Sequence, residues 1–225
     1  MAKNLLTPGQ ALKRVLAKEI APIHSFFGED YFFQDLILDG ISDIVLSESE
    51  KKNTFIMGVD NEDDFLNLFN SNSLFSQKSV IVVKNAKKIK PKFYDEVIDY
   101  CKNPSMDNYV VFIFNDPYSS NKFIDSISNL STCVDMRTPF PNKMKEWVRY
   151  YCKKNNFILP DSTLTDLVDN YGENINNVIN EIDKLYLHSL GKIEDVNLSI
   201  ESNAYKKESQ AVSYTHLTLP TKMIV

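Results

Sequence analysis

The sequence predicts an α/β protein in which a mostly parallel sheet, with helices packed on both faces, is followed by a small bundle of helices. Over residues 1–139, short β-branched and aromatic runs alternate with helix-length segments, and this alternation is typical of a parallel sheet. Beyond residue 139 the strand-like runs stop and only helical periodicity remains. The two patterns together predict two domains.

The elements of the first domain follow in order along the chain. Thr7 and Pro8 suit the cap and the first position of a helix, whose apolar stripe includes Leu12 and Val15. Runs "SVIVV" and "YVVFIF" are apolar enough to be strands buried on both faces of a sheet. The strand candidates are "PIHSFF" (22–27), "NTFIM" (53–57), "SVIVV" (79–83), "YVVFIF" (109–114) and "TCVDM" (132–136).

A domain boundary is predicted in "TPFPNK", where Pro139 and Pro141 bracket Phe140 and prevent a strand from continuing. Beyond it, over residues 140–208, apolar residues recur at i, i+3, i+4 and i+7, as the core-facing stripes of three helices do. The stripes are Met144, Trp147, Val148 and Tyr151; Leu164, Leu167, Val168 and Tyr171; and Ile175, Val178, Ile179, Ile182 and Leu185. We expect a small three-helix, lid-like domain.

Composition bounds the class of protein. The 225 residues are 43% hydrophobic and 24% charged, which allows a buried core in one large or two smaller domains. No run approaches the ~18 apolar residues of a membrane helix, and "MAKNLLTPGQALKRVLAKEI" lacks the apolar stretch of a signal peptide, so we expect a cytoplasmic protein without a membrane partner. Cys101, Cys133 and Cys152 are far apart in sequence, which favours buried free thiols over disulfides or a zinc knuckle.

Ligands of open α/β sheets bind outside the carboxyl ends of the strands, where the first turn reads "FFGEDYFFQD". A phosphate-binding loop needs several glycines, followed by Lys and Ser/Thr for charge and magnesium. This turn has one glycine, Gly28, and Glu29 and Asp30 place carboxylates where phosphates would lie. Asp30 instead suits the N-cap of the following helix. In an ATPase, an acidic pair at the end of a strand such as "SVIVV" would hold magnesium, but here Lys84 and Asn85 follow this strand. We therefore expect a nucleotide-binding shape with no cofactor, metal or catalytic residue.

Other chemistry has weaker signals. His24, His188 and His216 have no spacing that suggests metal ligation, and no serine or cysteine sits in a nucleophile elbow. Asp116 before Pro117 is typical of a turn.

The basic run "KNAKKIKPK", from Lys84 to Lys92, could meet a DNA backbone or an acidic partner. A solvated loop is the simpler interpretation, and the net charge of −5 argues against a general nucleic-acid binder. Two alternatives stay open, a P-loop-like nucleotide hydrolase with an unorthodox site and a nucleic-acid-binding module that uses the Lys84 to Lys92 run.

The most informative pair is Leu74 and Phe75, which stand in the small polar run "NSNSLFSQK" (70–78). An acidic helix start precedes them, with Phe65 and Phe69 in the buried stripe of that helix. The pair could fold back into the core. It could also protrude as an apolar plug for a partner's pocket, because a small aromatic and aliphatic anchor can dominate a protein interface.

The sequence resembles the delta subunit of the bacterial DNA polymerase III clamp loader. The resemblance covers roughly residues 5–205 and rests on "FFGED" followed by a helix, on "NSNSLFSQKSVIVV", and on "MKEWVRYYCKKNNFILPDSTLTDLVDNYGENINNVINEIDKLYL" with its Glu181 and Lys184. It implies an ATPase-like (RecA/AAA+-type) fold that has lost its nucleotide site. It also implies a subunit that binds and opens the sliding clamp (the beta subunit) in DNA replication, while ATPase subunits of the loader hydrolyse ATP and primed DNA is met through the complex.

In the family, a Gln-x-Met-Ser-Leu-Phe-like motif enters a hydrophobic pocket of the clamp. The resemblance places this motif on Asn70, Asn72, Ser73, Leu74 and Phe75, with asparagines in place of the glutamine and the methionine. It implies no catalysis by this chain itself, although the holoenzyme is a nucleotidyltransferase.

The end of the chain departs from the family, whose members continue into a third, helical collar domain. The stretch "VSYTHLTLPTKMIV" resembles translated adapter sequence. We expect the collar domain to be missing and residues 209–225 to be a non-native or disordered tail.

Overall fold

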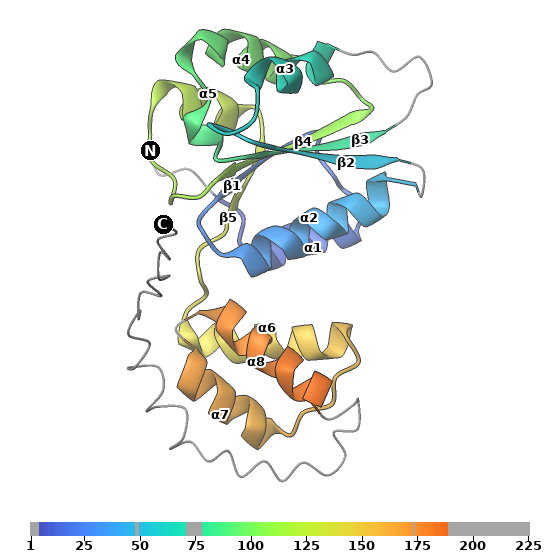
Figure 1. Ribbon diagram of the computed structural model, residues 1–225, viewed down its shortest axis with the longest axis vertical. Coiled ribbons are helices and arrows are strands. Elements are labelled where there is room, and N and C mark those ends of the chain that lie inside the picture. The colour runs from blue at the N-terminus through green and yellow to red at the C-terminus, as the bar shows by residue number, and fades with distance from the viewer. Residues whose placement is uncertain (1–4, 48–49, 71–77, 173, 189–225) are drawn as a thin grey trace, which may run out of the picture.

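The computed structural model describes residues 5–47, 50–70, 78–172 and 174–188 (Figure 1). Its elements are α1 (Pro8–Leu16), β1 (Ile23–Phe27), α2 (Tyr31–Val45), β2 (Lys51–Ile56), α3 (Glu62–Asn70), β3 (Ser79–Lys84), the 3-10 turns η1 (Ala86–Lys88) and η2 (Pro91–Phe93), α4 (Tyr94–Lys102), β4 (Asn108–Phe114), α5 (Lys122–Asn129), β5 (Thr132–Asp135), α6 (Pro141–Lys154), α7 (Asp161–Tyr171) and α8 (Ile175–His188). No described helix is long and apolar enough to cross a membrane.

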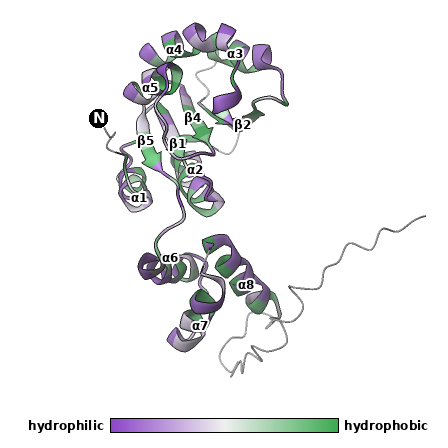
Figure 2. Ribbon diagram, turned by 90° about the vertical axis from the view of Figure 1, so that its left-hand side faces the viewer, coloured by the Kyte–Doolittle hydropathy of each residue, from purple (hydrophilic) through white to green (hydrophobic). Residues whose placement is uncertain are grey.

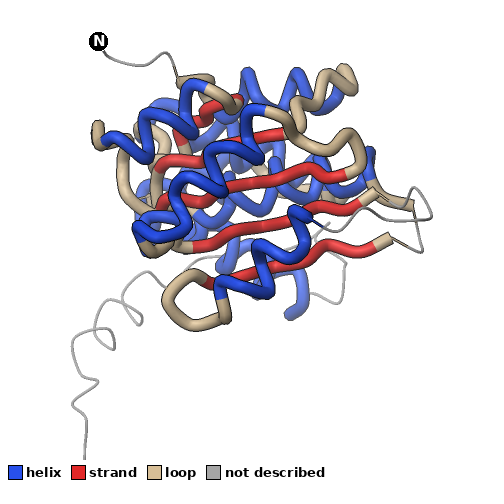
Figure 3. The backbone as a smooth tube through the Cα atoms, turned by 90° about the horizontal axis from the view of Figure 1, so that it is seen from above, coloured by secondary structure: helices blue, strands red, loops and turns tan. Residues whose placement is uncertain are grey.

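The five predicted strands form one parallel sheet in the order β2-β3-β4-β1-β5, which confirms the predicted fold class. In Figure 1, α1 and α2 cover one face, while α3, α4 and α5 cover the other. The strands lie side by side between these helices in Figure 3. This order places β4 at the centre of the sheet with β1 beside it, so the turn after β1 lies beside the turn after β4.

Two hydrophobic clusters fill the faces of the sheet. Residues 80–83 of β3 are all 0% exposed, because alternate side chains enter opposite clusters. In Figure 2 the strands are mostly hydrophobic, whereas the helices carry both hydrophilic and hydrophobic residues, as amphipathic covering layers do. The three cysteines are buried and free, as predicted.

Local capping signals in the sequence are confirmed at two helices. Thr7 and Gln10 form a capping box at the start of α1, with the Gln10 N–H donating to Thr7 Oγ1 at 3.3 Å. Asp30 caps α2, where its Oδ1 accepts from the Phe33 N–H at 3.3 Å.

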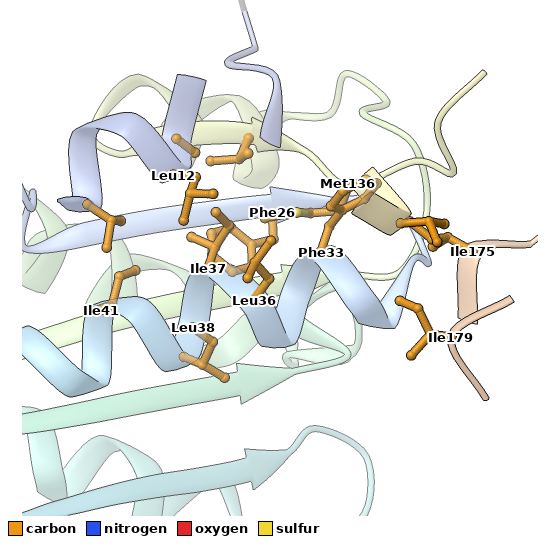
Figure 4. Packing of buried hydrophobic residues seen from close by; sticks show 14 of the residues in the cluster. Leu12, Phe26, Phe33, Leu36, Ile37, Leu38, Ile41, Met136, Ile175 and Ile179 are labelled. Atoms are coloured by element: carbon orange, nitrogen blue, oxygen red, sulfur yellow. The ribbon is translucent and has the colours of Figure 1, made fainter. Parts of the chain in front are cut away.

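The three C-terminal helices α6, α7 and α8 pack against one another and join the core beside α2. Phe33 of α2 meets Trp147 of α6 edge-on, with ring centroids 4.8 Å apart. Figure 4 shows Ile175 and Ile179 of α8 close to Phe33 and Met136. The division into domains at residues 139 and 208 stays a prediction, and residues 189–225, including the predicted tail, lie outside the described residues.

One buried titratable group lies in the centre of this sheet. His24 on β1 is 4% exposed, between the neighbouring strands β4 and β5. Its Nδ1 has no hydrogen-bond partner in the described part of the chain. Burial lowers the pKa of His24 from 6.5 to about 4.

We therefore predict that His24 makes the fold sensitive to mild acid. Between pH 6.5 and pH 4 the imidazole of His24 is protonated in the unfolded chain and neutral in the native protein. The free energy of unfolding therefore decreases as the pH falls through this range. From pH 7 to pH 5 this group alone should lower the free energy of unfolding by about 2 kcal/mol. Urea denaturation of the wild type and of His24→Gln across this range measures the difference in slope. Parallel curves for the two proteins would contradict the assignment.

Candidate functional site

A site could be built at either end of the parallel strands. We call the side where the strands end the carboxyl edge and the side where they begin the amino edge. The carboxyl edge carries the turns that follow β1, β3, β4 and β5, and the amino edge carries the connections that lead into β2, β3 and β4. Nucleotide chemistry would lie at the carboxyl edge. The predicted clamp-binding residues stand between α3 and β3 in the sequence, and β3 begins at the amino edge.

The turn after β1 is tied into the protein by its own backbone. The Gly28 N–H donates to the Phe114 carbonyl at 3.1 Å, and the Asp30 N–H donates to the Met136 carbonyl at 2.9 Å. A phosphate cradle needs such N–H groups to point at the ligand. Here they bond the ends of β4 and β5.

Gly28 has a packing role in this turn. Its φ is +128°, and a Cβ at this position would lie 2.4 Å from the Met136 carbonyl carbon and 2.6 Å from the Arg137 nitrogen. Its carbonyl accepts from buried Gln34 Nε2 at 2.8 Å. The glycine is required because two backbones meet here.

The positive N-terminus of α2 is already occupied by a carboxylate of the chain. Asp30 is 2% exposed. Burial raises the pKa of Asp30, while the hydrogen bond from the Phe33 backbone acts in the opposite direction. The Phe33 N–H bonds Oδ1 of Asp30, whereas the buried Oδ2 has no hydrogen-bond partner among the described residues.

The ends of β3 and β4 offer amides and one paired carboxylate. The backbone of Asn85 adopts the left-handed conformation, with φ of 56°. Its side-chain Oδ1 accepts a hydrogen bond from Asn115 Nδ2 at 2.7 Å. Asp116, predicted to be a turn residue, pairs with Lys87 at 2.8 Å. Among the described residues, no group of three or more His, Cys, Asp or Glu side chains could hold a metal ion.

The basic run after β3 forms two 3-10 turns, and several of its lysines have local partners. Lys87 pairs with Asp116, and Lys90 Nζ lies 2.9 Å from Glu62 Oε2, whose side chain is 3% exposed. Lys92 lies over the Phe93 ring at 4.2 Å. These pairings reduce the charge that the run could offer to a DNA backbone.

A cleft of about 510 Å³ lies between the start of α1, the end of β5 and α6. Phe33, Phe140 and Trp147 supply apolar walls. Its cations are paired within the protein, Arg137 with Asp135 at 2.6 Å and Lys143 with Glu146 at 2.9 Å. The cleft therefore offers mainly apolar contact and few free charges.

At the amino edge, the end of α3 is fixed by aromatic packing. Phe69 is 6% exposed, and its ring stacks on Tyr100 of α4 with centroids 4.0 Å apart and an interplanar angle of 7°. Phe65 meets Phe69 edge-on at 4.5 Å. The helix therefore ends against α4, at the residue where the predicted motif begins.

The start of β3 is fixed by hydrogen bonds. The Lys78 N–H donates to Glu50 Oε1 at 2.6 Å, and the Ser79 N–H donates to the Asp107 carbonyl at 2.8 Å. Ser79 Oγ also donates to Asn108 Oδ1 at 2.7 Å. The connection between α3 and β3 thus has firmly held ends.

The predicted clamp-binding residues fall within this connection. Asn70 is the last residue of α3. Asn72, Ser73, Leu74 and Phe75 lie outside the described residues, so their role stays a prediction.

Sequence reasoning did not single out Met106, which is 83% exposed in the short connection between α4 and β4. The available signal was one large apolar residue in the turn-forming run "KNPSMDN".

No protein-family model matches the chain, and no curated protein matches it with significance. Two solved structures are similar to this chain in fold. The DNA clamp loader delta protein (YqeN) of Bacillus subtilis is similar with a TM-score of 0.62 and 14% identity, over 79% of this chain and 56% of that protein. Domain III of the replication initiation protein DnaA of Thermotoga maritima is similar with a TM-score of 0.54 and 13% identity, over 85% of this chain and 86% of that one.

These likenesses show that the chain shares its α/β fold, a five-stranded parallel sheet with flanking helices, with these two replication proteins. The chain spans little more than half the length of the delta protein that it matches.

The closed turn after β1 predicts that this chain does not bind ATP. Addition of millimolar ATP and magnesium should leave the melting temperature unchanged, because only a ligand that binds the native state raises its stability. Calorimetric titration provides the direct measurement. Micromolar affinity that is lost in Glu29→Ala or Lys84→Ala would contradict the prediction.

Proposed function

We propose that this chain is a clamp-loader subunit of the delta type, which binds a ring-shaped sliding clamp and opens one of its interfaces during DNA replication. The observation that carries the proposal is the position of "NSNSLF" (70–75). The motif joins two firmly held elements at the amino edge of an AAA+-like sheet. The fold likeness to a clamp loader delta protein supports the same assignment.

In this proposal the chain binds and positions its partner but performs no phosphoryl transfer. Gly28 and Asp30 use their N–H groups within the protein, and the Asp30 carboxylate occupies the N-terminus of α2. ATP would be bound and hydrolysed by neighbouring ATPase subunits of the loader, and primed DNA would be met through the assembled complex. No cofactor is needed for this role.

Leu74 and Phe75 would act as the apolar anchors, with Asn70, Asn72 and Ser73 beside them. The short connection is anchored by Phe69 at one end and by Lys78 and Ser79 at the other. Fixed ends lower the conformational entropy that binding must remove, so more of the contact energy remains as affinity. An aromatic and aliphatic pair of this kind is well suited to an interface hot spot.

The second domain, which we place at residues 140–208, would then orient the clamp-binding domain within the loader. Trp147 of α6 packs on Phe33, and Ile175 and Ile179 of α8 belong to the same hydrophobic cluster as Phe33. These contacts join α6 and α8 to the start of α2. A displacement of the helices would therefore move the sheet with its amino edge.

Replacement of both Leu74 and Phe75 by Ala is predicted to weaken clamp binding by at least ~2 kcal/mol, roughly thirtyfold. The free energy of unfolding should change by less than about 1 kcal/mol, because no core cavity forms. Titration calorimetry with a panel of purified bacterial sliding clamps and urea denaturation measure the two quantities.

Val59→Ala combined with Ile158→Ala is the matched control, since these apolar side chains are 77% and 73% exposed and lie after β2 and between α6 and α7. The control should bind the clamps normally. If the Leu74 and Phe75 double variant binds normally and loses roughly 2 to 5 kcal/mol of stability for each truncation, the pair belongs to the core.

A further inference from the structure

We propose that a groove between α6 and α7 binds an acidic, amphipathic segment of a partner protein. The groove has a volume of about 480 Å³ and is formed by the end of α6, the connection 155–160 and the start of α7. These helices lie below the sheet in Figure 1. The inference goes beyond the proposed function and does not depend on it, because the groove includes no residue of the sheet or of its amino edge.

The groove has an apolar floor and an exposed apolar wall. Cys152 of α6 and Leu164 of α7 are 6% and 2% exposed, so the floor is part of the core of the helical bundle. Phe157 and Leu159 line the groove from the connection, and Ile158 between them is 73% exposed. Removal of these apolar surfaces from water by a partner's side chain would be favourable.

The connection that carries Ile158 is held by the surrounding helices. The Phe157 N–H donates to the Cys152 carbonyl at 2.8 Å, and the Phe157 ring stacks on Tyr186 of α8 with centroids 4.1 Å apart. This stack places the end of α8 beside the connection, and the next residue of α8, Leu187, is 74% exposed. A fixed wall loses little conformational entropy when a partner binds, so more of the contact energy remains as affinity.

The α6 side of the groove is basic. α6 contains five Lys or Arg residues and one Glu, although the whole chain has a net charge of −5. Arg149 and Lys153 both line the groove, and their spacing of four residues places them on the same face of the helix. Arg149 pairs with Asp161 of α7 at 3.3 Å. Lys153 and its neighbour Lys154 are exposed, and neither forms an ion pair with a described residue.

Unpaired cations beside an apolar floor define the chemistry of the partner. The dipole of α6 favours cations in its last turn, but this interaction leaves the ammonium groups of Lys153 and Lys154 open to a partner's carboxylates. Complementary charge speeds association and selects the partner, while apolar side chains buried in the groove supply affinity. An amphipathic helix with leucines on one face and glutamates beside them has both properties.

A nucleic acid fits this groove less well than an acidic protein segment. Phosphates could meet Lys153 and Lys154, but a phosphate backbone has no apolar side chain to cover Ile158 or the floor. The Asp161 carboxylate, whose side chain is 80% exposed, would also repel phosphates. A peptide can place its carboxylates near the lysines and its apolar residues near Ile158.

Binding of three synthetic helical peptides to the full chain tests the chemistry of the partner. The probe is a fluorescently labelled leucine–glutamate helix with leucines at i, i+3, i+4 and i+7. One control peptide has lysine in place of every glutamate, and the other has alanine in place of every leucine. Fluorescence polarisation should show that the probe binds at least tenfold more tightly than either control. Equal affinities for the three peptides, or no binding of the probe at millimolar concentration, would overturn the inference.

Charge reversal tests the position of the site. Lys153→Glu combined with Lys154→Glu should weaken probe binding at least tenfold. The matched control is Lys13→Glu combined with Arg14→Glu, an exposed pair in the last turn of α1, which changes the net charge equally and should alter affinity less than threefold. Both double variants place acidic residues at a helix C-terminus, so their melting temperatures should fall by a similar, small amount. An equal loss of binding in the two would overturn the inference.

The apolar wall is tested by Ile158→Asp, which should weaken probe binding at least tenfold. Val59→Asp is the matched control, with a side chain 77% exposed after β2, and should change affinity less than threefold. Normal probe binding by Ile158→Asp would contradict the assignment. The same variant should bind the sliding clamps as the wild type does, and a parallel loss of clamp affinity would make the groove part of the clamp contact instead.

Two further results would assign the groove to another occupant and overturn the inference. Displacement of the probe by a duplex oligonucleotide, weakened by Lys153→Glu combined with Lys154→Glu, would make the groove a nucleic-acid site. Self-association of the chain in gel filtration that is lost in Ile158→Asp would make it a contact with a second copy. The inference expects neither displacement nor self-association.

Discussion

The close approach of Gly28 to the backbone of Met136 determines how the turn after β1 meets the end of the sheet. With no Cβ on Gly28, the two backbones come near enough for the Met136 N–H to bond the Phe27 carbonyl at 2.7 Å and for Asp30 to bond back to Met136. Phe33 and Met136 then lie together where α6 and α8 pack. Any larger residue would separate α2 from β5 and disturb the support of the C-terminal helices.

The same constraint gives the two edges of the sheet different chemical properties. At the carboxyl edge, the turn N–H groups and the N-terminus of α2 are used by the protein itself. At the amino edge, hydrogen bonds hold the ends of connections and leave Met106 in solvent. The two ends of the same parallel strands therefore carry different kinds of contact: backbone bonds that close the turns at one end, and held connections at the other.

The sequence predicted the features that depend on local pattern. All five strands, the caps at Thr7 and Asp30, and the stripes of α6, α7 and α8 follow from alternation, capping chemistry and helical periodicity. Contacts between distant segments left no such signal. Three contacts depend on strand order and helix placement, which residue spacing does not encode: the Phe69 stack on Tyr100, the Ser79 bond to Asp107 and the Phe33 contact with Trp147. The motif around Leu74 was predicted by resemblance and stays a prediction, whereas the exposure of Met106 had no clear signal in the sequence.

The value of a short binding segment depends on how its ends are held. A flexible loop pays an entropy cost that grows as the logarithm of its length, and each ordered side chain adds about 0.5–1.5 kcal/mol on binding. Phe69 and Ser79 fix the two ends of a seven-residue connection, numbered 71–77, and both reach the α4–β4 region. Because the region of Met106 links both ends, disorder there would loosen both anchors at once.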